Sequence, residues 1–374
     1  MKKITTLALG LLLASAAFAQ KGNKAEVLPS LQSTLGKHFL IGVAVDTRLP
    51  AGQDPAAEAI VKEQFNQVVA ENCMKGEENH PEVNRFDFTD GDKLVDWAER
   101  NGKTVIGHCL VWHSQPPKWM FTDANGKTVN REVLIGRMYN HIMTVVTHYK
   151  GKIKGWDVVN EAFEDDGSYR KSPYYNIIGP EFIELAFQFA HEADPNVELY
   201  YNDYSTSKPG KREAICKLVR SLKSKGLRID AVGMQSHNGY NYPDYAEYEK
   251  SIEAFAAEGV KVMMTELDVN MLPNPEGFGG AEISQSFELQ AKYNPYTKGL
   301  DKKGQKLFNQ RYLDLFKIIE RHKDVISRVT FWGVNDGHTW LNDWPIKGRT
   351  NYPTLIDRNN QLKPVVKDIE KLFE

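Results

Sequence analysis

Two glutamates stand in similar contexts in this sequence. Glu161 comes at the end of the apolar run in WDVVNEAF, and Glu266 comes at the end of the apolar run in VMMTELDV, about one hundred residues further on. Both contexts place a carboxylate where a buried β-strand ends. Two carboxylates that face each other across a sugar are the groups that hydrolyse a glycosidic bond. Glu161 and Glu266 are therefore our candidate catalytic pair.

A single glutamate at a strand end is more often a structural ion-pair partner, so the pair needs a fold that brings both together. Eight apolar or β-branched runs predict eight strands, with helical patterns between them. The runs cover residues 38–46, 66–73, 103–113, 153–161, 197–203, 229–237, 261–269 and 327–336, and the clearest helical patterns cover 92–102, 133–151, 180–195, 211–226, 244–259 and 310–322. Eight strand-helix alternations predict an α/β protein with a single (β/α)8 TIM barrel. Glu161 and Glu266 then belong to its fourth and seventh strands.

The unusual polar and aromatic residues follow the same plan. Each cluster falls at the carboxyl end of a predicted strand, which is where such barrels carry their active sites. These residues are Glu71, Asn72, His108, Trp112, His113, Asn160, Glu161, Asn202, Asp203, Gln235, His237, Glu266, Asp268 and Trp332. A full ring of such clusters is much stronger evidence for a site than any one of them.

One connection is longer than the others. Residues 270–306, after the seventh strand, are rich in Pro, Gly and Asn and do not fit one helix. We expect an extended loop after the seventh strand that builds one wall of the cleft.

The first residues have the pattern of a secretory signal peptide. Lys2 and Lys3 precede an apolar stretch from Thr6 to Ala17, and Ala17-Phe18-Ala19 is a small-residue cleavage site. A membrane anchor is the alternative, but the apolar run is too short for a stable span. We expect residues 1–19 to be a signal peptide and residues 20–374 to be one catalytic domain, exported to the periplasm or the medium without a membrane anchor.

Charge and metal-ligand patterns exclude several classes of function. The formal net charge is -2, and acidic and basic residues are mixed along the chain. This distribution gives no positive electrostatic field that would attract nucleic acid or anionic membranes. A neutral polysaccharide fits this balance. His108 and His113 could suggest a metal pair, but no carboxylate stands at the spacing of a helical HExxH site, so we expect neither a metal nor a cofactor.

Six strings together resemble a known family. In chain order they are ENCMK, GHCLVWHSQPPKW, WDVVNEAF, MQSH, TELDV and FWGVNDGHTW. In this order and spacing they resemble the endo-β-1,4-xylanases of glycoside hydrolase family 10, from about Leu31 to the C-terminus. The resemblance implies a retaining, endo-acting hydrolase of xylan and xylo-oligosaccharides, with Glu161 as acid/base and Glu266 as nucleophile. We expect it to act as a monomer.

The resemblance also assigns supporting residues. His237 and Asp268 resemble the family's chain in which an imidazole links the nucleophile to a second acid. Asn160 is similar to the asparagine that hydrogen-bonds the sugar 2-hydroxyl. The residues that the resemblance places around the sugar are Glu71, Asn72, Lys75, His108, Trp112, Gln235, Trp332 and Trp340.

At one position the chain departs from the family. A tryptophan commonly follows the lysine of ENxMK, whereas Gly76 follows Lys75 here. We expect this glycine to leave the cleft wall roomier.

Two other functions compete with xylan hydrolysis. A related hydrolase of β-1,4-glucan or mannan would keep the barrel and both glutamates, and would differ in how it crowds the hydroxymethyl group of the sugar. A polysaccharide-binding protein without activity would keep the aromatic residues but would not need Glu161, Glu266, His237 and Asp268 together. The presence of all four favours an enzyme.

Overall fold

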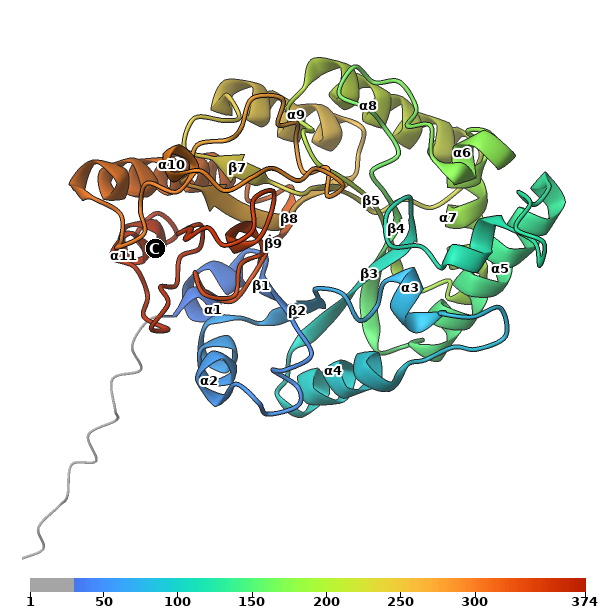
Figure 1. Ribbon diagram of the computed structural model, residues 1–374, viewed down its shortest axis with the longest axis horizontal. Coiled ribbons are helices and arrows are strands. Elements are labelled where there is room, and N and C mark those ends of the chain that lie inside the picture. The colour runs from blue at the N-terminus through green and yellow to red at the C-terminus, as the bar shows by residue number, and fades with distance from the viewer. Residues whose placement is uncertain (1–29) are drawn as a thin grey trace, which may run out of the picture.

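The computed structural model describes residues 30–374 (Figure 1). The expected signal peptide, residues 1–19, lies outside the described residues. Within the described part, no helix combines the length and apolar character that crossing a membrane requires.

Parallel strands close into a barrel. Its eight strands are β1 (Leu40–Val45), β2 (Gln67–Ala70), β3 (Thr104–Trp112), β4 (Ile153–Asn160), β5 (Glu198–Asp203), β6 (Ala231–Met234), β8 (Lys261–Asn270) and β9 (Ile326–Phe331). The ring closes where β1 pairs with β9, with Leu40 opposite Arg328, and it continues where β6 pairs with β8. The predicted (β/α)8 barrel is confirmed, as is the place of Glu161 directly after the fourth barrel strand and of Glu266 in the seventh.

The sixth predicted strand differs from the expected continuous run. β6 ends at Met234, and Ser236 has a φ of 64°, which breaks the strand. The chain then resumes as β7 (His237–Gly239), which pairs with the outer part of β8 and puts His237 opposite Asp268. This break is what turns His237 toward the seventh strand.

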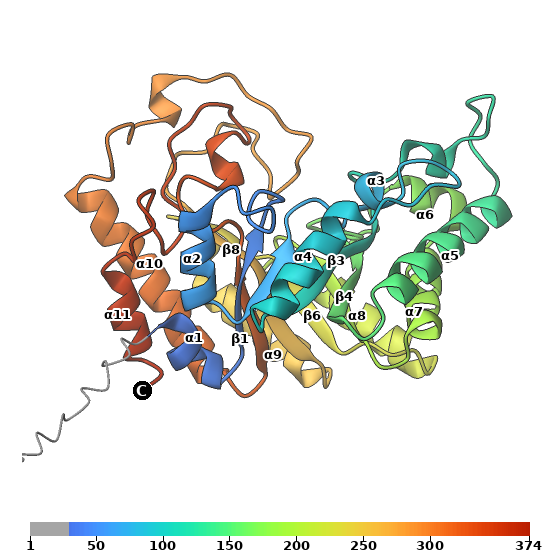
Figure 2. The same ribbon diagram turned by 90° about the horizontal axis from the view of Figure 1, so that it is seen from below.

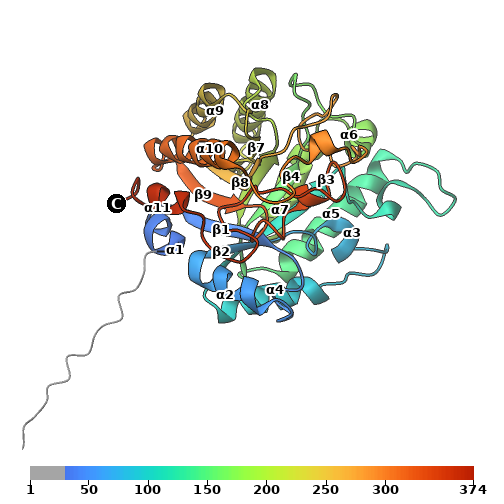
Figure 3. The same ribbon diagram turned by 60° about the vertical axis from the view of Figure 1, so that its left-hand side comes forward.

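Helices surround the barrel (Figures 1 and 3). They are α1 (Leu31–Thr34), α2 (Pro55–Gln64), α3 (Gly76–Asn79), α4 (Thr89–Arg100), α5 (Arg131–His148), α6 (Pro173–Ile178), α7 (Phe182–Ala193), α8 (Pro209–Ser224), α9 (Tyr245–Ala257), α10 (Lys302–Arg321) and α11 (Val365–Glu370), with 3-10 turns at Leu35–Lys37, Lys118–Phe121, Ala291–Tyr293 and Trp340–Asn342. Several begin at a side chain that accepts from the first turn, such as Asn130 before α5 and Asp244 before α9. Asp301 caps α10, so this helix starts earlier than the predicted 310–322.

Two apolar layers hold the barrel together. The larger lies between the strands and the helices, and its strand side includes Val43, Val68 and Trp156, each at most 1 % exposed. Packing requires a glycine at position 107, because a Cβ on Gly107 would lie 2.1 Å from the Trp156 ring. A smaller cluster that includes Ala44 and Tyr200 contains Trp332, a candidate site residue at the open end of the strands.

The long segment after the seventh strand is irregular, as predicted. Between the end of β8 at Asn270 and the start of α10 at Lys302, only the short turn Ala291–Tyr293 has helical structure. Figure 2 shows this segment, in orange, extending beyond the ends of the strands. It therefore lies on the side of the barrel where the candidate site residues gather.

Candidate active site

The predicted site residues converge at one end of the barrel. A cavity of about 140 Å³ brings together side chains from the ends of six strands and from the long segment after β8. Its lining consists of Glu71, Asn72, Lys75, His108, Trp112, Gln115, Asn160, Glu161, Gln235, His237, Glu266, Ala281, Ile283, Trp332 and Trp340. Every predicted catalytic or sugar-binding residue is in this lining except Asp268, which lies behind His237. Sequence reasoning missed Gln115, Ala281 and Ile283, which come from loops.

Glu161 is a buried carboxyl that two donors hold in place. Trp112 Nε1 donates to its Oε2 at 2.8 Å, and Gln235 Nε2 donates to its Oε1 at 2.8 Å. The side chain is only 5 % exposed. Burial raises the pKa of Glu161 above its ordinary value, although His113 and the bond from Gln235 act in the opposite direction. A carboxyl in this environment retains its proton more readily and can donate it.

Glu266 is equally buried but its pKa moves in the opposite direction. Burial alone would raise the pKa of this carboxyl, but the hydrogen bond from His237 and neighbouring positive charge lower it below the ordinary value. Asn202 Nδ2 donates to Glu266 Oε1 at 2.8 Å, and His237 Nε2 lies 3.1 Å from Oε2. Two carboxyls whose surroundings separate their pKa values are suited to different roles, one as an acid and one as an anion.

His237 connects Glu266 to a second acid. Its Nδ1 lies 2.9 Å from Asp268 Oδ2, and this oxygen also accepts from Trp340 Nε1 at 2.9 Å. Burial lowers the pKa of His237, but the charges and hydrogen bonds of Asp268 and Glu266 outweigh this effect and raise the pKa to about 10. The imidazole is therefore a cation that can donate from both nitrogens, which keeps Glu266 ionised and fixes its orientation.

Replacing His237 with asparagine should reduce turnover about a hundredfold while the protein remains folded. Without the cation the pKa of Glu266 rises, so the acidic limb of the kcat/KM profile should move to higher pH. Steady-state kinetics across pH measure both effects. His191→Asn, on an exposed position of α7, is the matched control. A variant with wild-type turnover and an unchanged acidic limb would show that His237 does not support Glu266 in catalysis.

Amide side chains join the two carboxyls. Asn202 Nδ2 donates to Asn160 Oδ1 at 3.0 Å as well as to Glu266, and Asn202 Oδ1 accepts from Thr265 Oγ1 at 2.6 Å. Gln235 contacts both Asn160, at 3.3 Å, and Glu161. Asn202 is fully buried. Its place at the end of the fifth strand was visible in the sequence, but its bond to Glu266 was not.

The predicted sugar-binding residues are held by specific partners. Lys75 Nζ donates to Asn72 Oδ1 and to Gln115 Oε1, both at 2.9 Å, and it lies 5.0 Å from the centre of the Trp112 ring. His108 Nδ1 lies 2.9 Å from Asp157 Oδ2. These contacts leave polar atoms and an indole fixed around the cavity before any sugar enters.

The tryptophans of the last loop close the cavity on its other side. Trp332 packs edge-on against His108, with ring centres 5.4 Å apart. Trp340 lies 4.8 Å from the His237 ring and stacks on Trp344 at 4.3 Å. Indole faces suit the weakly apolar faces of sugar rings.

The expected opening at Gly76 is wrong. A Cβ at this position would lie 2.9 Å from Pro117 Cδ, and the gap beside it measures only about 10 Å³. Gln115 reinforces this wall, because its Nε2 donates to Glu77 Oε1 at 2.8 Å while its Oε1 binds Lys75. Residues after the third strand therefore fill the space that the glycine leaves, which the local sequence does not show.

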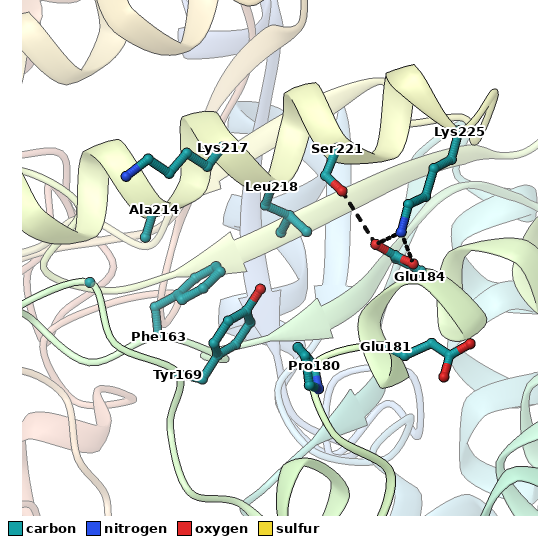
Figure 4. Close-up of a pocket in the computed structure, with 11 residues that line it drawn as sticks. Phe163, Tyr169, Pro180, Glu181, Glu184, Ala214, Lys217, Leu218, Ser221 and Lys225 are labelled. Atoms are coloured by element: carbon teal, nitrogen blue, oxygen red, sulfur yellow. Dashed lines mark hydrogen bonds and ion pairs between the residues drawn. The ribbon is translucent and has the colours of Figure 1, made fainter.

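A separate cavity of about 470 Å³ lies between α7 and α8 (Figure 4). Its two carboxylates are both paired with cations: Glu184 accepts from Lys225 at 2.6 Å and from Ser221 at 3.3 Å, and Glu181 pairs with Arg131. These ion pairs occupy both carboxylates, whereas Glu161 and Glu266 are buried in one cavity among hydrogen-bond donors, so we assign the chemistry to the cavity at the strand ends. No group of three or more His, Cys, Asp or Glu residues within 30–374 is arranged to hold a metal ion.

Comparison with known proteins places these residues in one family. The model of glycosyl hydrolase family 10 matches residues 30–372. The endo-1,4-beta-xylanase A of Xylanibacter ruminicola is 60 % identical over 375 residues and covers 100 % of both chains. The beta-1,4-xylanase of Dictyoglomus thermophilum is 38 % identical over 370 residues, which is 98 % of each chain. A solved family 10 endoxylanase retrieved from a sugarcane soil metagenome superimposes with a TM-score of 0.86 at 43 % identity, covering 92 % of this chain and 99 % of that one.

Proposed function

Because the chain belongs to glycosyl hydrolase family 10, we propose that it is an endo-1,4-β-xylanase that cleaves internal β-1,4 bonds of xylan and retains the anomeric configuration. The observation that carries this proposal is the pair of buried carboxyls in one cavity whose pKa values shift in opposite directions. Retaining hydrolysis needs one protonated and one ionised carboxyl in the resting enzyme.

In the first step the Glu266 carboxylate attacks the anomeric carbon. Glu161 transfers its proton to the glycosidic oxygen, so the bond to the leaving chain breaks as a glycosyl ester of Glu266 forms. The departing chain leaves as an alcohol, and Glu161 becomes a carboxylate. Asn160, whose Nδ2 lies 3.3 Å from Glu161 Oε1 and whose Oδ1 accepts from Asn202, is placed to hydrogen-bond a sugar hydroxyl in this step.

In the second step the roles change. Glu266 is now a neutral ester, so no negative charge opposes the ionised Glu161, which takes a proton from water. The water oxygen attacks the same carbon, the ester bond to Glu266 breaks, and Glu161 regains its proton. Two displacements at one carbon restore the β configuration.

The shape of the site supports cleavage within a chain. A second cavity of about 710 Å³ shares His237 and Ala281 with the first and runs over the loops after β5, β7 and β8. Glu71, Asn72 and Lys75, from the segment after β2, line the first cavity together with the catalytic pair. The two cavities together therefore give a sugar chain room beyond the catalytic carboxyls, as an endo-acting enzyme requires.

Oligosaccharide digestion tests this function. We expect xylohexaose to give internal products of two to four sugars, and cellohexaose to react at least about a hundredfold more slowly, because glucose carries a hydroxymethyl group that the indoles of Trp332 and Trp340 crowd. Chromatography of early time points measures both rates. Release of single xylose units, or equal rates on the two substrates, would contradict the proposal.

We also propose that the chain acts outside the cytoplasm, in the periplasm or the medium, and that it is a monomer. The pattern in residues 1–19 supports the first part. Polymeric xylan would meet the enzyme only there.

A further inference from the structure

Glu161 has an unusual backbone conformation for a residue with a side chain. Its φ is 59°, in the left-handed region that residues other than glycine seldom adopt. Such a conformation persists only where neighbouring groups hold it. One of these groups is Arg170, whose Nε donates to the carbonyl oxygen of Glu161 at 2.9 Å. The orientation of the Glu161 side chain therefore depends on where the Arg170 guanidinium lies.

The Arg170 guanidinium is fixed by side chains from two other segments of the chain. Its Nη1 lies 2.9 Å from Glu282 Oε2, and its Nη2 donates to the Tyr204 hydroxyl at 2.6 Å. Glu282 belongs to the long segment after β8 and lies 112 residues away in the chain. Glu164, on the same hairpin as Arg170, is more distant at 3.6 Å and is 45 % exposed.

His113 also lies between Glu282 and the carboxyl of Glu161. His113 Nε2 lies 3.8 Å from Glu282 Oε2, and its Nδ1 lies 3.9 Å from Glu161 Oε2. The proximity of His113, together with the hydrogen bonds from Ser284, lowers the pKa of Glu282 to about 2, so this side chain is a carboxylate throughout the working pH range.

The hairpin that carries Arg170 is held by the core, by α8 and by its own backbone. Phe163 is buried, Lys211 Nζ lies 3.5 Å from Asp165 Oδ1, and Arg170 N donates to Ala162 O at 2.9 Å. Phe163 and Tyr169 pair across it, and Glu164 N donates to Ser168 O at 2.8 Å. Figure 4 shows both rings on the wall of the cavity between α7 and α8, so this face of the hairpin borders open space. Among the contacts that fix the hairpin relative to Glu161, the Arg170 guanidinium is the one that Glu282 reaches.

We propose that Glu282 is a positioning residue for the general acid, which acts by holding Arg170 against the backbone of Glu161. The inference rests on the proposed role of Glu161 as the acid. It gives the segment after β8 a part in the chemistry, because this segment supplies the anion that keeps the acid aimed at the leaving oxygen.

A leaving-group comparison tests the proposal. Glu282→Gln keeps the size of the side chain and removes its charge, and Glu288→Gln, an exposed position in the same segment, is the matched control. We expect Glu282→Gln to lower kcat for xylohexaose about tenfold and to change the first-step rate on dinitrophenyl β-xylobioside, measured as the pre-steady-state burst of dinitrophenol, by less than about twofold, because this leaving group needs no proton. KM should change little, and Glu288→Gln should match the wild type on both substrates.

A second variant tests the same contact, so that the conclusion does not depend on whether Glu282→Gln folds normally. Arg170→Lys retains the charge but cannot bond Glu161 and Glu282 together, so it should show the same selective loss, and the double variant should lose little more than either single one. Equal losses in xylohexaose turnover and in the burst rate of dinitrophenol, a change in KM alone, or wild-type kinetics in Glu282→Gln would overturn the proposal. Glu161→Ala on the same substrates separates the two claims: if it shows no leaving-group selectivity, the proposed acid itself is wrong.

Discussion

Replacing Glu266 with alanine removes nearly all turnover, by at least about 10⁴-fold, on natural and activated substrates alike. The first step needs a carboxylate at the anomeric carbon, and no other ionised group occupies that position. The surrounding structure should survive, because Asp268 still pairs with His237 at 2.9 Å. Steady-state kinetics with xylohexaose and dinitrophenyl β-xylobioside, alongside thermal unfolding, measure the effect.

Azide distinguishes loss of the nucleophile from general damage. In Glu266→Ala, azide can enter the vacated space and attack the anomeric carbon once, which gives an azide product of inverted configuration. A glycosyl azide of retained configuration would show that another residue still forms the intermediate. Glu276→Ala, an exposed glutamate in the segment after β8, serves as the control and should retain full activity.

Replacing Glu161 with alanine should give a loss that depends on the substrate. Natural xylan needs a proton on its leaving oxygen, so its turnover should fall about 10³-fold or more, while the first step on dinitrophenyl β-xylobioside should continue almost unchanged. The glycosyl ester on Glu266 would then accumulate, because no base activates water. Pre-steady-state release of dinitrophenol, followed by slow turnover, measures this pattern.

Azide should also rescue this variant, with the opposite stereochemistry. It needs no base to attack the ester on Glu266, so it should accelerate the second step and give an azide product of retained configuration. The same loss on both substrates, with no response to azide, would assign Glu161 a structural role.

The strands and the catalytic pair could be predicted from the sequence because each leaves a local signal. Parallel barrel strands are buried on both faces, so they appear as continuous apolar runs, and the polar residues that follow them stand out. Glu161 lies at such a boundary, directly after β4, whereas Glu266 lies within β8, which continues to Asn270 rather than ending there as expected. The fold then brings them together, although about one hundred residues separate them.

The parts of the site that the sequence did not predict depend on contacts between distant loops. Glu282 meets Arg170 across 112 residues, and Gln115 meets Lys75 across 40 residues. Neither loop has a periodic pattern that would orient its side chains. The expectation for Gly76 was wrong for the same reason, since Pro117, from another loop, fills the space beside it.

Covalent trapping tests the central claim most directly. The probe is a 2-deoxy-2-fluoro xylobioside with a dinitrophenol leaving group. The fluorine lowers the rates of both steps, and the good leaving group restores the rate of the first step. The glycosyl-enzyme should therefore accumulate. We predict that the mass of the wild-type protein increases by one fluoroxylobiosyl group, that peptide mapping places this group on Glu266, and that Glu266→Ala gains none. A label on another side chain, or steady turnover without any label, would contradict the assignment of Glu266 as the nucleophile.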